Sequence, residues 1–170
     1  YIFTVIATDE AGNISEPSTE LSITIDTTAP DSPVITTDTP LTNNPTPTIE
    51  GTAEAGSTVE LFNGDTSLGT ATADANGSFS ITTDELADDD YSLTVTATDA
   101  AGNTSSASTA LALTIDTAAP EAPVITTDTA LTNDNTPVIQ GTAEAESTVT
   151  LLSGGVEIGT TIANGDGQFL

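Results

Sequence analysis

The chain has 170 residues and carries 26 Asp and Glu residues but no Lys, Arg or His, so its formal net charge is −26 at pH 7. This charge excludes nucleic acid partners, which require cationic side chains to release phosphate counterions, and it argues against association with an anionic membrane surface. The chain has no Cys and therefore no disulfides, and no apolar run approaches the ~20 residues of a membrane-inserted span.

The sequence repeats itself every 90 residues without a gap. More than half of the positions are identical when residues 1–80 are laid over residues 91–170, and Tyr1 then falls on Tyr91. A repeat of this length corresponds to one small domain of a tandem array. Because the copies show no insertion or deletion, the linker between domains is predicted to have a fixed length.

Residues 1–27 contain two alternating segments, which we interpret as the last two strands of a truncated repeat. Residues 28–117 form the complete repeat, and residues 118–170 supply the first five strands of another truncated repeat. Because the chain begins and ends within predicted strands, we expect it to be a piece of a longer protein. Alone, each partial repeat would expose unpaired strand edges.

The complete repeat contains seven short segments with the alternation of β-strands, each closed by a turn signal. They are residues 33–37, 46–52, 58–62, 67–73, 78–82, 91–97 and 110–115. No segment has helical periodicity. Seven strands in about 90 residues predict an all-β chain of tandem immunoglobulin-like, seven-stranded β-sandwiches, with a closed barrel as the structural alternative.

Tyr91 opens the clearest strand and follows an acidic turn that begins after Thr83. Immunoglobulin-like sandwiches place a tyrosine corner at this point, where the phenol OH hydrogen-bonds to backbone a few residues upstream. The sequence therefore predicts a tyrosine corner, and the alternative is an ordinary core tyrosine.

Two longer motifs recur in successive repeats. The first is Asp26-Thr-Thr-Ala-Pro-Asp-Ser-Pro-Val-Ile, repeated as Asp116-Thr-Ala-Ala-Pro-Glu-Ala-Pro-Val-Ile. The second is Ala7-Thr-Asp-Glu-Ala-Gly-Asn-Ile-Ser, repeated as Ala97-Thr-Asp-Ala-Ala-Gly-Asn-Thr-Ser. Together with Gly51-Thr-Ala-Glu-Ala-Gly, these motifs resemble the bacterial Ig-like repeats of giant surface adhesins and biofilm-associated proteins, and the resemblance covers the whole chain.

The resemblance implies an extender, in which many copies hold a distal adhesive region away from the bacterial cell for adhesion and biofilm formation. The partners of each repeat are then its neighbours in the same chain, and a host or surface ligand is bound by distal regions. In several members of the family Ca²⁺ binds between domains and stiffens the rod. Export by type I secretion, common in the family, implies an extracellular location on the cell surface.

The expected topology supports a Ca²⁺ site independently. In a seven-stranded sandwich the loops after residues 52, 73 and 97 share one pole with the incoming linker. We predict that this pole and its counterparts bind Ca²⁺, which takes 6–8 oxygen ligands, whereas Zn²⁺ would require His or Cys. The candidate ligands are the acids and amides of the linkers and loops, namely Asp9, Asp26, Asp31, Glu54, Asp99, Asn103, Asp116 and Glu121.

The competing interpretation is that Asp and Asn at these positions only form turns. We favour the turn for the segment Asp74-Ala-Asn-Gly, and a metal for Asp26 with Asp99 and for their counterparts Asp116 and Asp9. The acidic run at residues 84–90 lies at the opposite pole. Such runs are usually solvated, although this one borders the next junction and could share its calcium.

No enzymatic activity is expected. Without His, Cys or Lys, no Ser or Thr has a conventional base for nucleophilic catalysis, and acids in turns at domain poles are poor candidates for a glycosidase pair. The alternating Thr residues are typical of any solvated β-face, so ice binding is a minor alternative. The serious alternative to an extender is a module that itself binds a carbohydrate or protein ligand.

Overall fold

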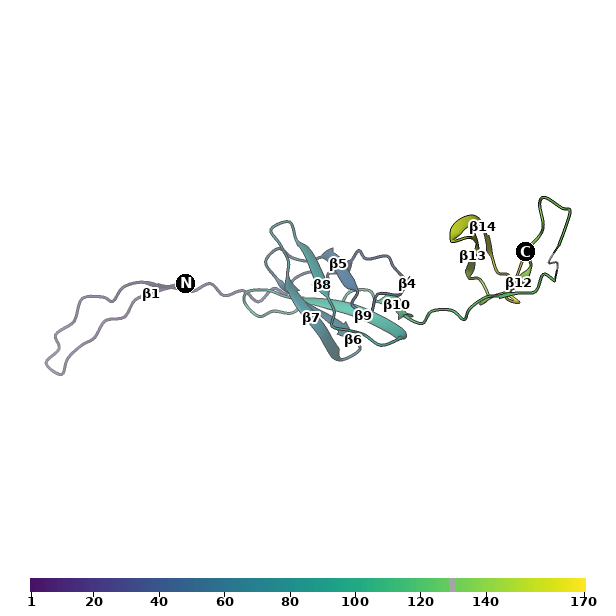
Figure 1. Ribbon diagram of the computed structural model, residues 1–170. Coiled ribbons are helices and arrows are strands. Elements are labelled where there is room, and N and C mark those ends of the chain that lie inside the picture. The colour runs from purple at the N-terminus through teal and green to yellow at the C-terminus, as the bar shows by residue number, and fades with distance from the viewer. Residues whose placement is uncertain (129–130) are drawn as a thin grey trace. The chain divides into compact units, whose positions relative to one another are not determined.

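The computed structural model describes residues 1–128 and 131–170, and the regular elements among them are strands, which confirms the all-β prediction (Figure 1). None of the described residues belongs to a helix that could cross a membrane. The chain divides into two units, residues 1–117 and residues 118–170, and the second includes the two residues that are not described.

The first unit opens with a hairpin. Its strands β1 (Ile2–Phe3) and β2 (Leu21–Ser22) pair antiparallel. The sandwich that follows has two sheets. The first sheet has the order β3 (Val34–Ile35), β5 (Thr48–Thr52), β8 (Ser78–Thr82). The second has the order β4 (Leu41–Thr42), β10 (Leu111–Ile115), β9 (Asp89–Thr98), β6 (Thr58–Asn63), β7 (Thr66–Thr72).

This architecture confirms an immunoglobulin-like sandwich rather than a barrel. The predicted strand boundaries lie within about two residues of the observed ones. However, the sandwich has eight strands rather than seven, because β4 had not been predicted. β4 has two residues and pairs parallel to β10, with Leu41 opposite Thr114. Two residues are too few to show an alternation, so only the tertiary pairing reveals this strand.

The core lies between the two sheets and is made by alternate residues of the strands. In β9 the inward side chains Leu93, Val95 and Ala97 are fully buried, while the residues between them are only half-buried. The facing sheet contributes large apolar side chains that include Ile49 and Phe79. Because successive side chains of a strand point to opposite faces, the alternating apolar residues of both sheets face each other and form one core.

Tyr91 forms the predicted tyrosine corner. Its phenol OH donates a hydrogen bond to the backbone carbonyl of Ala87, with an oxygen–oxygen distance of 3.0 Å. The ring also packs against the core cluster. Tyr91 therefore connects the start of β9 to the acidic segment that precedes it, which includes Asp88.

The described residues of the second unit form strands in two sheets. One sheet has the order β11 (Val124–Ile125), β12 (Gly141–Thr142), β15 (Gln168–Phe169), and a second sheet pairs β13 (Thr148–Ser153) with β14 (Val156–Ile162). The β13–β14 pair repeats the register of β6–β7, including the irregularity after Leu151, which matches the one after Leu61. These two strand pairs, 90 residues apart in the sequence, therefore have the same register.

Gly51 is required by close packing inside the sandwich. A Cβ atom at this position would lie 2.2 Å from the carbonyl oxygen of Val34 and 2.5 Å from the ring of Phe79. The same contacts recur at Gly141, with Val124 and Phe169. Because one of the clashing atoms belongs to the backbone of a paired strand, the structure cannot absorb a methyl group by rotating a side chain.

We therefore expect Gly51→Ala to destabilise the sandwich by about 2 kcal/mol or more through overpacking, which lowers its thermal midpoint by about 10 °C. Differential scanning calorimetry of the full chain measures this. Gly159→Ala is the control, because its methyl group meets no atom within 4 Å. Equal midpoints for Gly51→Ala and the unmodified chain would contradict the packing argument.

Candidate functional site

The linker that enters the sandwich is held by the loop between β9 and β10. The hydroxyl of Ser32 donates a hydrogen bond of 2.8 Å to the carbonyl of Ala107. Upstream, the side-chain amide of Asn103 donates to the carbonyl of Asp26 at 3.2 Å. The loops after β5 and β7 meet at the same end, where the backbone N–H of Ala53 donates to Gly77 at 2.8 Å. The three loops and the linker thus share one pole, as the topology requires.

Asp99 closes the turn that positions Asn103. Its Oδ1 accepts hydrogen bonds from the backbone N–H groups of Ala101 and Asn103, at 2.8 and 2.9 Å. Its Oδ2 accepts from the side-chain amide of Asn103 at 2.8 Å. The side-chain bond from Asn103, followed by the backbone bonds, holds the pKa of Asp99 below its ordinary value of 3.8.

Asp9 forms the same turn in the hairpin. Its Oδ1 accepts from the N–H groups of Ala11 and Asn13 at 2.9 and 2.8 Å, and its Oδ2 accepts from the side chain of Asn13 at 2.7 Å. The bond from the Asn13 side chain is the main reason that the pKa of Asp9 is also lowered. Asp9 and Asp99 therefore act as hydrogen-bond acceptors within their own turns.

In the turn after β7, a neutral side-chain oxygen can accept the same two backbone hydrogen bonds as a carboxylate oxygen. Asp74 Oδ1 accepts from the N–H groups of Asn76 and Ser78 at 2.8 and 2.9 Å, and the bond from Ser78 contributes most to its lowered pKa. In the next repeat the neutral Asn164 makes the same bonds to Asp166 and Gln168 at 3.0 and 2.8 Å. This exchange supports the turn interpretation that the sequence favoured for Asp74.

The remaining candidate ligands are less closely grouped. Asp31 and Glu54 line one shallow polar depression of about 330 Å³ at the linker pole. Asp26 Oδ1 accepts a hydrogen bond from the N–H of Thr28 at 3.0 Å. Asp116 donates its N–H to the carbonyl of Thr42 at 3.0 Å, at the other end of the sandwich. Glu121 belongs to the second unit.

The shared pole does not amount to a metal cage. Within residues 1–128 and 131–170, no three acidic side chains are grouped closely enough to hold a metal ion together. The oxygens of Asp99 and Asp9 are in addition engaged by N–H donors. Within one repeat, the described residues therefore do not fit a preformed calcium site, and the calcium ligand set stays a prediction.

Two acids of the run at residues 84–90 have a structural role that sequence reasoning missed. Asp88 Oδ1 accepts hydrogen bonds from the N–H and the hydroxyl of Thr117, at 3.1 and 2.8 Å. Asp90 Oδ1 accepts from the hydroxyl of Thr114 at 2.5 Å. The outgoing linker is thus attached to the acidic loop. The sequence signal was weak, because these acids can be matched to their Thr partners only when the register of β9 against β10 is known.

Two serines that were also missed stabilise the loop that holds the linker. Ser105 Oγ accepts from the N–H of Ala97 at 2.9 Å, and Ser108 Oγ accepts from the N–H of Val95 at 3.1 Å. Both serines are buried. Their recurrence as Ser15 and Ser18, in otherwise variable surroundings, was the signal that could have identified them.

The family model described as Bacterial Ig-like domain matches residues 28–117. The chain belongs to the bacterial Ig-like domain family. Among curated proteins it resembles Exoglucanase B from Cellulomonas fimi, with 37% identity over 130 residues that cover 69% of the chain and 11% of the relative. Among solved structures it resembles the biofilm associated protein BSP domain, with 26% identity, a TM-score of 0.43, and coverage of 70% of the chain and 20% of that structure.

The chain spans 11% of the length of Exoglucanase B and 20% of the solved chain, so it corresponds to a small part of each of these proteins. The family membership describes the module in residues 28–117.

The lowered pKa of Asp99 predicts a pH dependence. A group whose pKa is lower in the folded state stabilises the fold above its unfolded pKa, and this contribution is lost as the pH falls through the folded value. Asp99→Asn should therefore lower the thermal midpoint near pH 7, and the difference from the unmodified chain should shrink below about pH 4. Thermal unfolding followed by circular dichroism measures both.

Asp65→Asn is the matched control, since it removes the same charge from a turn in which no side-chain hydrogen bond to Asp65 is described. Removing any one carboxylate from a chain of charge −26 reduces charge repulsion and so changes the thermal midpoint. The control measures this general effect so that it can be subtracted. A difference for Asp99→Asn that is the same at pH 7 and pH 3, once the control is subtracted, would contradict the capping role.

Proposed function

We propose that this chain is a non-catalytic, structural extender segment of a bacterial surface protein. The observation that carries the proposal is the attachment of both linkers to the sandwich. Asn103 holds the carbonyl of Asp26 at one pole, and Asp88 holds Thr117 at the other. Because both linkers are held against the sandwich, each domain restricts the orientation of its neighbours in the array, as a spacer requires.

Proline adds to this restraint. Pro30 and Pro33 are buried where the incoming linker joins the sandwich. Each ring fixes its own φ angle and keeps the preceding residue extended. Hydrogen bonds and the two proline rings therefore leave few backbone dihedral angles of the incoming linker free to rotate. Its counterpart at the next junction has Pro120 and Pro123 at the same positions of the repeat.

The proposed setting is the outside of a bacterial cell, reached by type I secretion. The partners of each repeat are its neighbours in the same polypeptide, and adhesion is left to distal regions. Family membership of residues 28–117 supports a bacterial Ig-like module, and the absence of cationic side chains supports a role without nucleic acid.

We further propose that Ca²⁺ stiffens the junctions. The support for this is electrostatic, since the array has 26 acids and no cationic side chain. Two carboxylates ~5 Å apart repel by about 1 kcal/mol in water, and more where they are partly buried. Asp31 and Glu54, which share one depression, are the acids that a cation at the linker pole would neutralise first. An ion that binds only the folded state stabilises it by mass action.

Small-angle scattering tests both parts of the proposal. The chain should be elongated, with each repeat adding roughly 30–40 Å, since its strands of ~8 residues rise ~3.3 Å per residue and its loops add the rest. In millimolar Ca²⁺ the maximum dimension and the thermal midpoint should exceed those in EDTA. Asp116→Ala should reduce the calcium effect at one junction, while Asp65→Ala, with the same loss of charge, should not.

The outcomes separate the two parts. Identical dimensions and midpoints in Ca²⁺ and EDTA, with an elongated particle in both, would end the calcium proposal and leave the extender. A compact or freely bending particle in both conditions would contradict the extender itself. The alternative, a module that binds a ligand, would then be preferred.

A further inference from the structure

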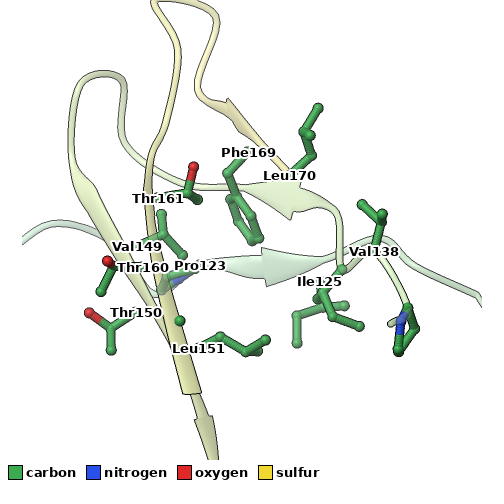
Figure 2. A pocket seen from close by; sticks show the side chains of 13 residues that line it. Pro123, Ile125, Val138, Val149, Thr150, Leu151, Thr160, Thr161, Phe169 and Leu170 are labelled. Carbon is green, nitrogen blue, oxygen red and sulfur yellow. The ribbon is translucent and has the colours of Figure 1, made fainter. Parts of the chain in front are cut away.

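The turn that joins β14 to β15 contains a reactive pair of residues. Thr161 of β14 and Phe169 of β15, both labelled in Figure 2, flank this turn of residues 163–167. Within it, Asn164 is followed by Gly165. In such a pair the backbone nitrogen of glycine can attack the side-chain amide carbon of asparagine, because glycine has no Cβ atom to block the approach.

The hydrogen bonds of Asn164 fix its side chain over its own backbone. Its Oδ1 accepts from the N–H groups of Asp166 and Gln168 at 3.0 and 2.8 Å. The bond from Asp166 reaches back over two residues, and the ring that it closes contains both the Asn164 amide carbon and the Gly165 nitrogen. Within residues 131–170, no hydrogen bond from the Gly165 N–H is described. The nucleophile is therefore unengaged and confined near its target.

The two N–H groups that hold Asn164 also supply electrostatic stabilisation. When a nucleophile adds to the amide carbon, negative charge develops on Oδ1. Donors that already point at this oxygen stabilise the charge without reorganisation, as in an oxyanion hole. The turn that fixes the side chain therefore also activates its amide group toward addition.

A carboxylate lies beside the glycine. A Cβ atom built on Gly165 would lie 3.7 Å from Oε1 of Glu146, and no other described atom outside residues 164–166 would lie within 4 Å. Glu146 and Gly165 are exposed, as are their counterparts Gly56 and Ala75 in the complete sandwich, so water reaches the site. A carboxylate at this place can take the proton of the glycine nitrogen, directly or through one water, and return it to the leaving group.

Glu146 has a strained backbone conformation. Its φ angle is 63°, and it is the one non-glycine residue with a positive φ in the part of the chain that the structure describes. Its counterpart in the complete repeat is Gly56, with a φ of 81°. Strain of this kind is concentrated at functional positions. The complete repeat has neither the strained glutamate nor the reactive pair, because Asp74-Ala75 takes the place of the pair.

The other two Asn-Gly pairs of the chain lack this arrangement. In Asn76-Gly77 the glycine N–H donates to the carbonyl of Asp74 at 2.9 Å, so the nitrogen is engaged. In Asn63-Gly64 the described bond to the asparagine Oδ1 is a single one, from the N–H of Ser92 at 3.2 Å. A Cβ atom on that glycine would meet no described atom within 4 Å, so no carboxylate lies beside it.

We propose that Asn164 is a site of self-catalysed deamidation, with Gly165 as the nucleophile and Glu146 as the general base. The Gly165 nitrogen bonds to the amide carbon of Asn164 while its proton passes to the Glu146 carboxylate. The bond from that carbon to Nδ2 then breaks, and the NH2 group takes the proton and leaves as ammonia. The product is a cyclic succinimide, which water opens at either carbonyl to give an aspartate or an isoaspartate at position 164.

The reaction replaces a neutral side chain by a carboxylate. An aspartate at position 164 can preserve the turn, because Asp74 accepts the two equivalent bonds in the complete repeat. An isoaspartate adds a methylene group to the backbone and disturbs the bond from the N–H of Asn164 to the carbonyl of Gln168. The proposal does not rest on the extender function, and either can fail without the other.

Mass spectrometry of the 170-residue chain tests the assignment. The protein is incubated at neutral pH in buffer and in concentrated urea, and chymotryptic peptides report the deamidation of each asparagine. In buffer Asn164 should react about tenfold faster than Asn63 and Asn76, or more. In urea the three rates should converge, because the turn is lost. A rate at Asn164 that is no faster in buffer than in urea, or that Asn63 or Asn76 matches in buffer, would overturn the proposal.

Variants at position 146 separate the carboxylate from the backbone strain. Glu146→Gln keeps the strained backbone but removes the base, whereas Glu146→Gly restores the residue of the complete repeat and removes both. Each should slow the reaction in buffer by about tenfold, and in urea each should match the unmodified chain. Glu144→Gln, which removes a charge from the same loop, should leave the rate unchanged. Slowing by Glu146→Gly alone, or by Glu144→Gln as much as by Glu146→Gln, would contradict the general base.

Gly165→Ala tests the nucleophile. The added methyl group hinders the approach of the nitrogen and should slow the reaction by about tenfold or more. The turn should persist, because the methyl group would meet Glu146 at an ordinary contact distance and the complete repeat has Ala75 at this position. An unchanged rate would show that water attacks Asn164 directly, and the proposed route would then be wrong.

Discussion

β9 pairs with β6 on one side and with β10 on the other, and its inward side chains, Leu93, Val95 and Ala97, are fully buried. The two sheets meet over this strand, so its burial holds the sandwich together through the hydrophobic effect. The segments that flank it hold the linkers, with Asp88 before it and Asn103 after it. The stability of the core and the direction of the chain therefore depend on the same strand.

The polar groups around β9 show how the fold tolerates a net charge of −26. Asp88, Asp90 and Asp99 accept hydrogen bonds from hydroxyl, amide or backbone N–H groups. Such bonds to a charged acceptor are stronger than neutral ones and need no cationic partner. Neutral Asn164, which replaces Asp74 in the following repeat, makes the same bonds. The acids thus serve mainly as acceptors in turns, and their charge remains for solution cations to balance.

The sequence by itself determined the all-β class, the immunoglobulin-like sandwich, the strand positions and the corner at Tyr91, because alternation and turn residues are local signals that repeat every 90 residues. It also placed the linker and three loops at one pole. Only the tertiary structure decided that β4 joins β10, that Asp88 holds Thr117, and that Asp99 engages its own turn instead of joining a cluster of acids. These features depend on register and on distances between residues far apart in the chain, which composition and spacing do not specify.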